Sequence, residues 1–169
     1  PPKNYGVLID IAAMVLREYP DWQWDIVGEG ELRLELDQRI KNAGLEGRLF
    51  LKGQVQDLYD RYQEYSFLVL TSLREGFPMV LLEGAAKGLP LVSFDIETGP
   101  NEIILDGENG YLIEAFDQPA MIRRIKELIQ SRELRLEMSG KSRERSKDFA
   151  LDRIMGQWIQ LFRDLAPGV

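Results

Sequence analysis

The chain has 169 residues, which is enough for one domain with a sizeable core, and its formal net charge is −7. This acidic balance argues against a broad nucleic-acid-binding face, because proteins that neutralise a phosphate backbone usually carry a basic excess. The chain has no cysteine and no histidine, which excludes disulfides and thiolate metal sites and removes the commonest general base and metal ligand.

The first half of the chain alternates helical and strand patterns. Lys3 to Glu18 predicts a helix, because its apolar residues recur near the i, i+3, i+4, i+7 spacing. Trp24 to Val27 predicts a short strand, and a second helix is expected from about Glu31 to Ala43. Arg48 to Lys52 predicts a second strand, and Val55 to Glu64 predicts a short helix.

The second half continues the alternation. Ser66 to Thr71 predicts a buried strand, and the helix after it is expected to open at Pro78 and close at Gly88. Leu89 to Phe94 is another nearly continuous apolar strand. The remaining expected elements are a one-turn helix at Glu102 to Leu105, a strand at Tyr111 to Ile113, a helix from Asp117 to about Gln130, and a charge-rich helical segment from Ser131 to Leu165.

This order of elements predicts an α/β fold. Short apolar strands alternating with helices are typical of a parallel sheet with helices on both faces, and right-handed crossovers then give a Rossmann-like, doubly wound layer. No repeat or low-complexity tract divides the chain, so residues 1–169 are interpreted as a single domain. Ligands of such sheets bind beyond the carboxyl ends of the strands.

Two glutamates frame the helix that begins near Pro78. Glu75 lies on the loop before it and Glu83 lies one to two turns inside it. The amides of Gly76, Phe77, Met79 and Val80, with the helix dipole, suit a diphosphate, while carboxylates suit sugar hydroxyls. This spacing favours a nucleotide-sugar site, but it is equally compatible with Glu75 capping the helix and Glu83 lying on a solvated face.

The run E-G-F-P-M-V-L-L-E from Glu75 to Glu83 resembles the E-x7-E motif of family-four retaining glycosyltransferases with the GT-B fold. Other segments resemble that family in the same order along the chain, and the resemblance extends from about Lys3 to Leu165. They are V-G-E-G, F-L-K-G, Thr71-Ser72, G-L-P-L-V-S-F-D, T-G-P-N-E-I-I and D-G-E-N-G-Y-L-I. The chain therefore resembles the C-terminal, donor-binding half of such an enzyme.

The resemblance implies a role for each matching residue. Glu75, with the backbone from Gly76 to Met79, including Phe77 and Pro78, would hold the donor sugar. The amides of Val80 and Leu81 would meet the diphosphate, with Lys3 paired to the phosphates. Glu83 would bind the ribose, and the turn from Gly53 to Val55 would lie against the base. Glu75 and Lys3 are the expected catalytic residues, and no metal or cofactor is expected beside the nucleotide sugar.

The resemblance also implies what lies outside the sequence. The family has a first strand ending in an arginine shortly before the matching lysine, and an N-terminal domain that binds the acceptor. Both are expected to precede Pro1 in the full-length protein, so the chain alone is expected to be inactive. Gly28-Glu29-Gly30 lacks the third glycine of a dinucleotide fingerprint and is interpreted as a tight turn. Thr98 to Glu102 is either a capping turn or part of the cleft between the domains.

We therefore expect a hexosyltransferase that uses a nucleotide sugar, with a UDP-hexose favoured, and a polysaccharide or glycolipid acceptor. The alternatives are a GT-B-type sugar-nucleotide epimerase and a non-catalytic α/β module that binds a nucleotide or a protein. The chain has no apolar run near the roughly 20 residues that span a bilayer and no signal segment. A cytoplasmic location is expected, with peripheral membrane association only through the full-length protein, and no nucleic-acid partner.

Overall fold

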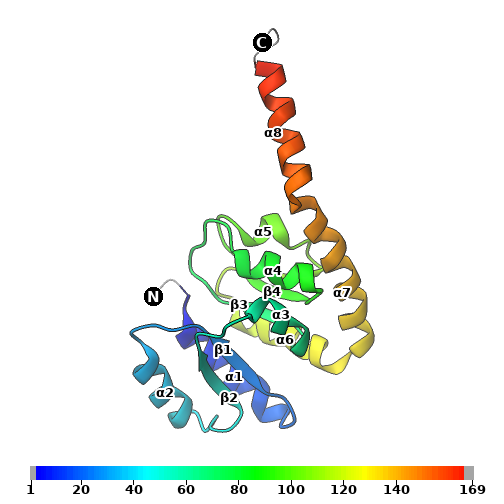
Figure 1. Cartoon of the computed structure of the whole chain (residues 1–169). Coiled ribbons are helices and arrows are strands. Elements are labelled where there is room, and N and C mark those ends of the chain that lie inside the picture. The colour runs from blue at the N-terminus through cyan, green and yellow to red at the C-terminus, as the bar shows by residue number, and fades with distance from the viewer. Residues whose placement is uncertain (1–2, 166–169) are drawn as a thin grey trace.

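The computed structural model of the chain describes residues 3–165. Its strands are β1 (Trp24–Val27), β2 (Leu49–Gly53), β3 (Leu68–Leu70), β4 (Leu91–Asp95) and β5 (Gly110–Glu114). Its helices are α1 (Tyr5–Glu18), α2 (Arg33–Asn42), α3 (Leu58–Arg61), α4 (Met79–Lys87), α5 (Pro100–Ile103), α6 (Gln118–Gln130), α7 (Arg132–Ser146) and α8 (Leu151–Leu165), with short 3-10 helices η1 (Tyr62–Glu64) and η2 (Lys147–Phe149). Parallel strands alternate with helices along the chain, as the sequence predicted (Figure 1).

The strands form two hydrogen-bonded pieces. β1 pairs with β2, and β3, β4 and β5 pair in that order, all of them parallel. No ladder joins β1 to β3 among the described residues, so the doubly wound sheet is interrupted at its centre. The predicted fold class is confirmed, but β1 and β3 each have one unpaired edge facing the interruption.

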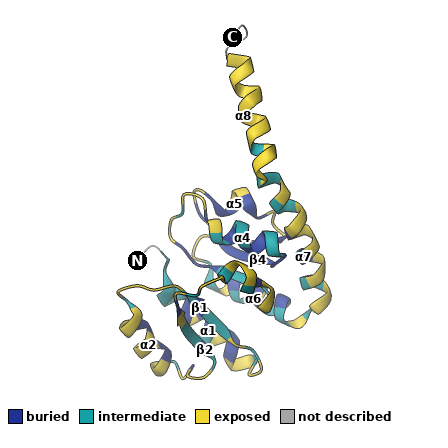
Figure 2. Cartoon of the chain, viewed as in Figure 1, coloured by how far each residue is buried: buried dark blue, intermediate teal, exposed yellow. Residues whose placement is uncertain are grey.

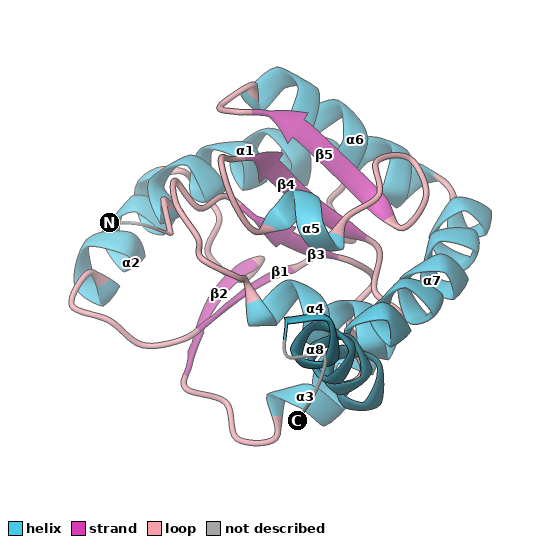
Figure 3. Cartoon of the chain, turned by 90° about the horizontal axis from the view of Figure 1, so that it is seen from above, coloured by secondary structure: helices cyan, strands magenta, loops and turns pink. Residues whose placement is uncertain are grey.

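Helix α1 holds the two pieces together. Its residues Ile11 and Val15 pack in a cluster with β4, β5 and α6, while Leu8 and Leu16 pack in a second cluster with β1, β2 and α2. A third cluster lies on the other face of the three-stranded piece, where α4 and α5 pack against Leu91. Figure 3 shows α1 and α6 on one side of the strands and α4 and α7 on the other.

Three predicted boundaries differ from the structure. The expected helix from Val55 to Glu64 begins only at Leu58, after Asp57 in a left-handed conformation, and continues as a 3-10 turn. The expected turn at Glu102 to Leu105 is instead Pro100–Ile103, because proline favours the first turn of a helix. The C-terminal helical segment breaks at η2, where Phe149 turns inward and stacks on Phe77 at a ring-centroid distance of 5.6 Å.

Helix α8 projects from the body of the domain (Figure 1). None of its residues is buried, and Figure 2 shows it as exposed along almost its whole length. Large apolar side chains, among them Trp158 and Phe162, are half exposed along it. No helix among the described residues is long and apolar enough to cross a membrane.

Candidate functional site

The loop between β3 and α4 carries Glu75, whose carboxylate meets groups from distant segments. Lys3 Nζ lies 2.6 Å from Glu75 Oε1, and Ser72 Oγ donates a hydrogen bond of 2.6 Å to the same oxygen. Thr98, from the loop after β4, donates to the Glu75 backbone carbonyl at 2.6 Å. The chain before α1 and the loops after β3 and β4 therefore meet at one residue.

These contacts decide between the two interpretations of Glu75. Its side chain is only 13% exposed, and no side chain caps the amino end of α4. The alternative in which Glu75 caps the helix is wrong. Both donors use Oε1, which leaves Oε2 for another hydrogen bond. Lys3 is 42% exposed, so its ammonium can be reached from solvent.

The amino end of α4 begins one residue later than predicted. Pro78 is the residue before the helix, and Met79 is its first residue. The Leu81 amide donates to the Pro78 carbonyl at 2.9 Å, and the Leu81 side chain is fully buried. The amides that lack an acceptor within the helix are therefore those of Met79 and Val80, and Leu81 is corrected to a core residue.

The loop after β4 packs closely on this helix start. Gly99 has φ of 100°, and a Cβ placed on it would lie 2.7 Å from Pro78 Cδ and 2.9 Å from the Gly76 carbonyl oxygen. Only glycine fits at such an approach and in this backbone conformation. The interpretation of residues 98 to 102 as a simple capping turn is therefore incomplete, because Thr98 and Gly99 shape the Glu75 loop.

Glu83 is the second framing carboxylate, and it is not a free surface residue. The hydroxyl of Tyr62 donates a hydrogen bond of 3.2 Å to Glu83 Oε2. Tyr62 is only 3% exposed, and burial, followed by the negative charge of Glu83, raises the pKa of its phenol well above the ordinary value. The phenol therefore stays protonated and donates to Glu83 throughout the neutral range.

Gly53 and Val55 lie at the carboxyl end of β2, on the other sheet piece. Gly53 is buried with φ of 69°, and its carbonyl accepts a hydrogen bond from the Gly28 amide at 2.8 Å. A hollow of about 270 Å³ lies beside this turn, and Lys3 is among its lining residues together with Gly28 and Glu29. Lys3 thus lies between the β2 turn and the Glu75 loop.

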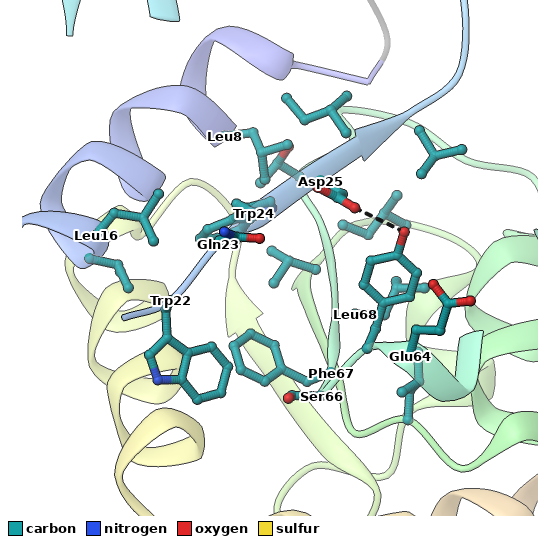
Figure 4. Close-up of a pocket in the computed structure, with 18 of the residues that line it drawn as sticks. Leu8, Leu16, Trp22, Gln23, Trp24, Asp25, Glu64, Ser66, Phe67 and Leu68 are labelled. Atoms are coloured by element: carbon teal, nitrogen blue, oxygen red, sulfur yellow. Dashed lines mark hydrogen bonds between the residues drawn. The ribbon is translucent and has the colours of Figure 1, made fainter. Parts of the chain in front are cut away.

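The largest cavity lies elsewhere. Its volume is about 650 Å³, and it is lined by residues 23–27 of β1 and residues 66–71 of β3, so it coincides with the interruption of the sheet. Figure 4 shows both strands beside it, with Asp25 accepting a hydrogen bond of 3.1 Å from the hydroxyl of Tyr65. Gly76, Phe77 and Glu83 are not among its lining residues.

Within residues 3–165 no group of three or more acidic side chains is placed to hold a metal ion. The sequence analysis named Lys3, Glu75 and Glu83, and the structure brings Lys3 and Glu75 into contact. It had no role for Tyr62, Ser72 or Gly99. For Tyr62 a signal existed, since its helical spacing predicted burial and a buried phenol hydroxyl needs a partner.

A model of the family described as glycosyl transferases group 1 matches residues 1–145. An uncharacterized glycosyltransferase of Haemophilus influenzae is 33% identical over 156 residues, which are 92% of this chain and 44% of that protein. The chain therefore spans less than half of the length of this relative.

Two solved structures show the same arrangement of strands and helices. One is TarM of Staphylococcus aureus in a complex with Fondaparinux, alpha-GlcNAc-glycerol and UDP, with a TM-score of 0.90 and 31% identity. The other is the pneumococcal O-GlcNAc transferase GtfA in complex with UDP and GlcNAc, with a TM-score of 0.85 and 29% identity. Each match covers 96% of this chain and 33% of the solved chain.

Proposed function

The chain belongs to the glycosyl transferases group 1 family, and we propose that it is the part of such an enzyme that binds the sugar donor. The proposed reaction is retaining transfer of a hexose from a nucleotide sugar to a polysaccharide or glycolipid acceptor. A UDP-hexose is the favoured donor, which the complexes of TarM and GtfA with UDP support.

The observation that carries this proposal is the placement of Glu75. Its carboxylate is fixed on one oxygen by Lys3 and Ser72, at the start of α4, with the other oxygen left over. A carboxylate held in this way is prepared to accept hydrogen bonds from sugar hydroxyls without first losing side-chain freedom. We assign Glu75 and the backbone from Gly76 to Met79 to the donor sugar.

The diphosphate is assigned to the amides of Met79 and Val80 and to Lys3. The positive end of the helix dipole attracts an anion there, and the exposed ammonium of Lys3 adds a full charge. In the reaction the bond between the anomeric carbon and the diphosphate breaks, and negative charge grows on the leaving group. These donors would stabilise that charge, while Glu75 orients the sugar.

The nucleoside is assigned to Glu83 and to the turn from Gly53 to Val55. Glu83 accepts from Tyr62 on Oε2, which leaves Oε1 for a ribose hydroxyl. The turn at Gly53 lies at the carboxyl end of its strand, where ligands of parallel sheets bind. Because the acceptor would be held by another domain, we expect the chain alone not to catalyse transfer.

We also propose that the full-length protein has a strand before Lys3 that lies between β1 and β3. Trp24 N donates to Arg48 O and Leu68 N donates to Pro90 O, each on the paired side of its strand. Since successive peptide groups of a strand point to opposite edges, Asp25 and Val69 direct theirs into the cavity between the pieces. The Lys3 carbonyl, which accepts from Thr71 at 3.1 Å, lies near the end of β3, where such a strand would finish.

Titration of the isotope-labelled chain with UDP tests the donor site. We expect amide shifts at residues 76–80 and at Gly53, and Glu83→Ala should weaken UDP binding by about 10-fold or more, since it removes a charged hydrogen-bond acceptor. Glu137→Ala, at an exposed position of α7, is the matched control and should bind UDP unchanged. Absence of binding at millimolar UDP would contradict the proposal.

Hydrogen exchange tests the missing strand separately. The amides of Asp25 and Val69 should exchange quickly in the present chain and slowly in the full-length protein, because a central strand protects its neighbours. The amide of Trp24, which is already bonded to Arg48, is the internal control and should be protected in both. Equal exchange of Asp25 and Val69 in the two proteins would refute the inserted strand.

A further inference from the structure

Tyr62 connects the segment before β3 to the helix that carries Glu83. It is the first residue of η1, and its ring lies in the apolar cluster formed with Leu81, Ala85 and their neighbours on α4 and β4. Its hydroxyl reaches Glu83 Oε2 at 3.2 Å, across 21 residues of sequence. The ring is therefore held by packing while the hydroxyl reaches the edge of the site.

The chemistry of this pair is one-directional. A neutral phenol has a single proton to donate, and a carboxylate only accepts. Burial and the charge of Glu83 both raise the pKa of Tyr62, so the proton stays on the phenol oxygen. Within residues 3–165, no other side chain donates to Glu83, and its Oε1 has no protein partner.

We propose that Tyr62 is a positioning residue that fixes the Glu83 carboxylate so that Oε1 accepts from the ribose hydroxyls of the donor. This inference rests on the proposed function, because it gives Glu83 its ribose role. A glutamate side chain loses several rotatable bonds when it binds a ligand, and a rigid donor removes part of that loss beforehand. Removing the donor should therefore reduce the benefit of the ribose hydroxyls.

The test compares UDP with 2′,3′-dideoxy-UDP, which lacks those hydroxyls, by calorimetric titration of the wild-type chain and of Tyr62→Phe. The wild-type chain should prefer UDP, and Tyr62→Phe should lower that preference by about 2- to 12-fold, the usual cost of immobilising one side chain. Affinity for the dideoxy nucleotide should not change. Glu83→Gln should also lower the preference, and adding Tyr62→Phe to it should have little further effect.

Tyr65→Phe is the matched control. It removes a similar hydrogen bond, from a partly buried phenol to the Asp25 carboxylate at 3.1 Å, but on the opposite side of β3 from Glu83. Its preference for UDP should equal that of the wild type. Because the preference is a ratio within one variant, a general loss of stability does not alter it. Phenylalanine keeps the ring, and Glu83 is partly exposed, so water can replace the lost donor.

The outcomes separate the two proposals. If the wild-type chain does not bind UDP, both the proposed function and this inference fail. If binding depends on Glu83 but Tyr62→Phe keeps the full preference for UDP, only the positioning role fails. If Tyr62→Phe weakens both nucleotides equally, Tyr62 is structural and the inference is again overturned.

Discussion

Lys3 and Glu75 lie 72 residues apart in the chain, and their side chains form an ion pair with 2.6 Å between Nζ and Oε1. The pair joins the segment before α1 to the loop between β3 and α4. Thr71 strengthens the same junction by donating to the backbone carbonyl of Lys3. The amino-terminal segment is therefore part of the candidate site.

Lys3→Ala should weaken UDP binding, because it removes the one full positive charge assigned to the diphosphate. The cost in stability should be small, about 1 kcal/mol or less, since Lys3 is 42% exposed. Lys126→Ala breaks an ion pair of equal length with Glu18 that lies away from the site, so it should cost similar stability and leave UDP binding unchanged. Thermal melting and calorimetry measure the two effects. Equal UDP affinities for the two variants would exclude the phosphate role of Lys3.

Gly99→Ala should destabilise the domain and disturb the start of α4. The new Cβ would meet Pro78 and the Gly76 carbonyl, and the residue would also be strained at φ of 100°. Gly107→Ala is the control, because Gly107 has φ of 76° with nothing within 4 Å of an added Cβ. In urea unfolding we expect Gly107→Ala to cost about 1–2 kcal/mol. Gly99→Ala should cost about 1 kcal/mol more, and identical costs would show that the close approach is not important.

The raised pKa of Tyr62 predicts a pH dependence of stability. A phenol with a raised folded-state pKa contributes stability that is fully present below about pH 10, the ordinary tyrosine pKa, and is lost as the pH rises further. The free energy of unfolding should therefore fall above about pH 10. Tyr65 and Tyr111, whose pKa values are also raised, should contribute in the same direction. Urea titrations between pH 8 and 12 should give a shallower fall for Tyr62→Phe, and an unchanged slope would contradict the assignment.

Truncation after Ala150 should leave the folding of the domain almost intact. It removes α8, which has no buried residue, and exposed segments contribute little to stability. Truncation after Ser146 is the comparison and should lower the melting temperature, because it also removes Phe149, which stacks on Phe77, and Asp148, which pairs with Arg145. Circular dichroism melts of both proteins test this. A large loss of stability in the shorter truncation would show that α8 packs on the domain.

Much of the fold could be predicted from local patterns in the sequence. Apolar periodicity located α1 and α6, and the Pro78 to Gly88 segment indicated α4 to within one residue. The order of strands and helices indicated a parallel α/β layer, and the spacing of Glu75 and Glu83 indicated the candidate site. These features depend on residues within a few turns of one another, so the sequence records them directly.

Only the tertiary structure decided which distant groups meet. Lys3 and Ser72 share one oxygen of Glu75, Tyr62 donates to Glu83, and Gly99 closes on Pro78. The interruption between β1 and β3 is likewise invisible in a list of elements. Local spacing predicts which face of a helix or strand is buried, but it carries no information on which remote segment packs there. That choice is made by the joint packing of α1, α4 and the strand ends, and here it determines which atoms of the two glutamates remain available to a ligand.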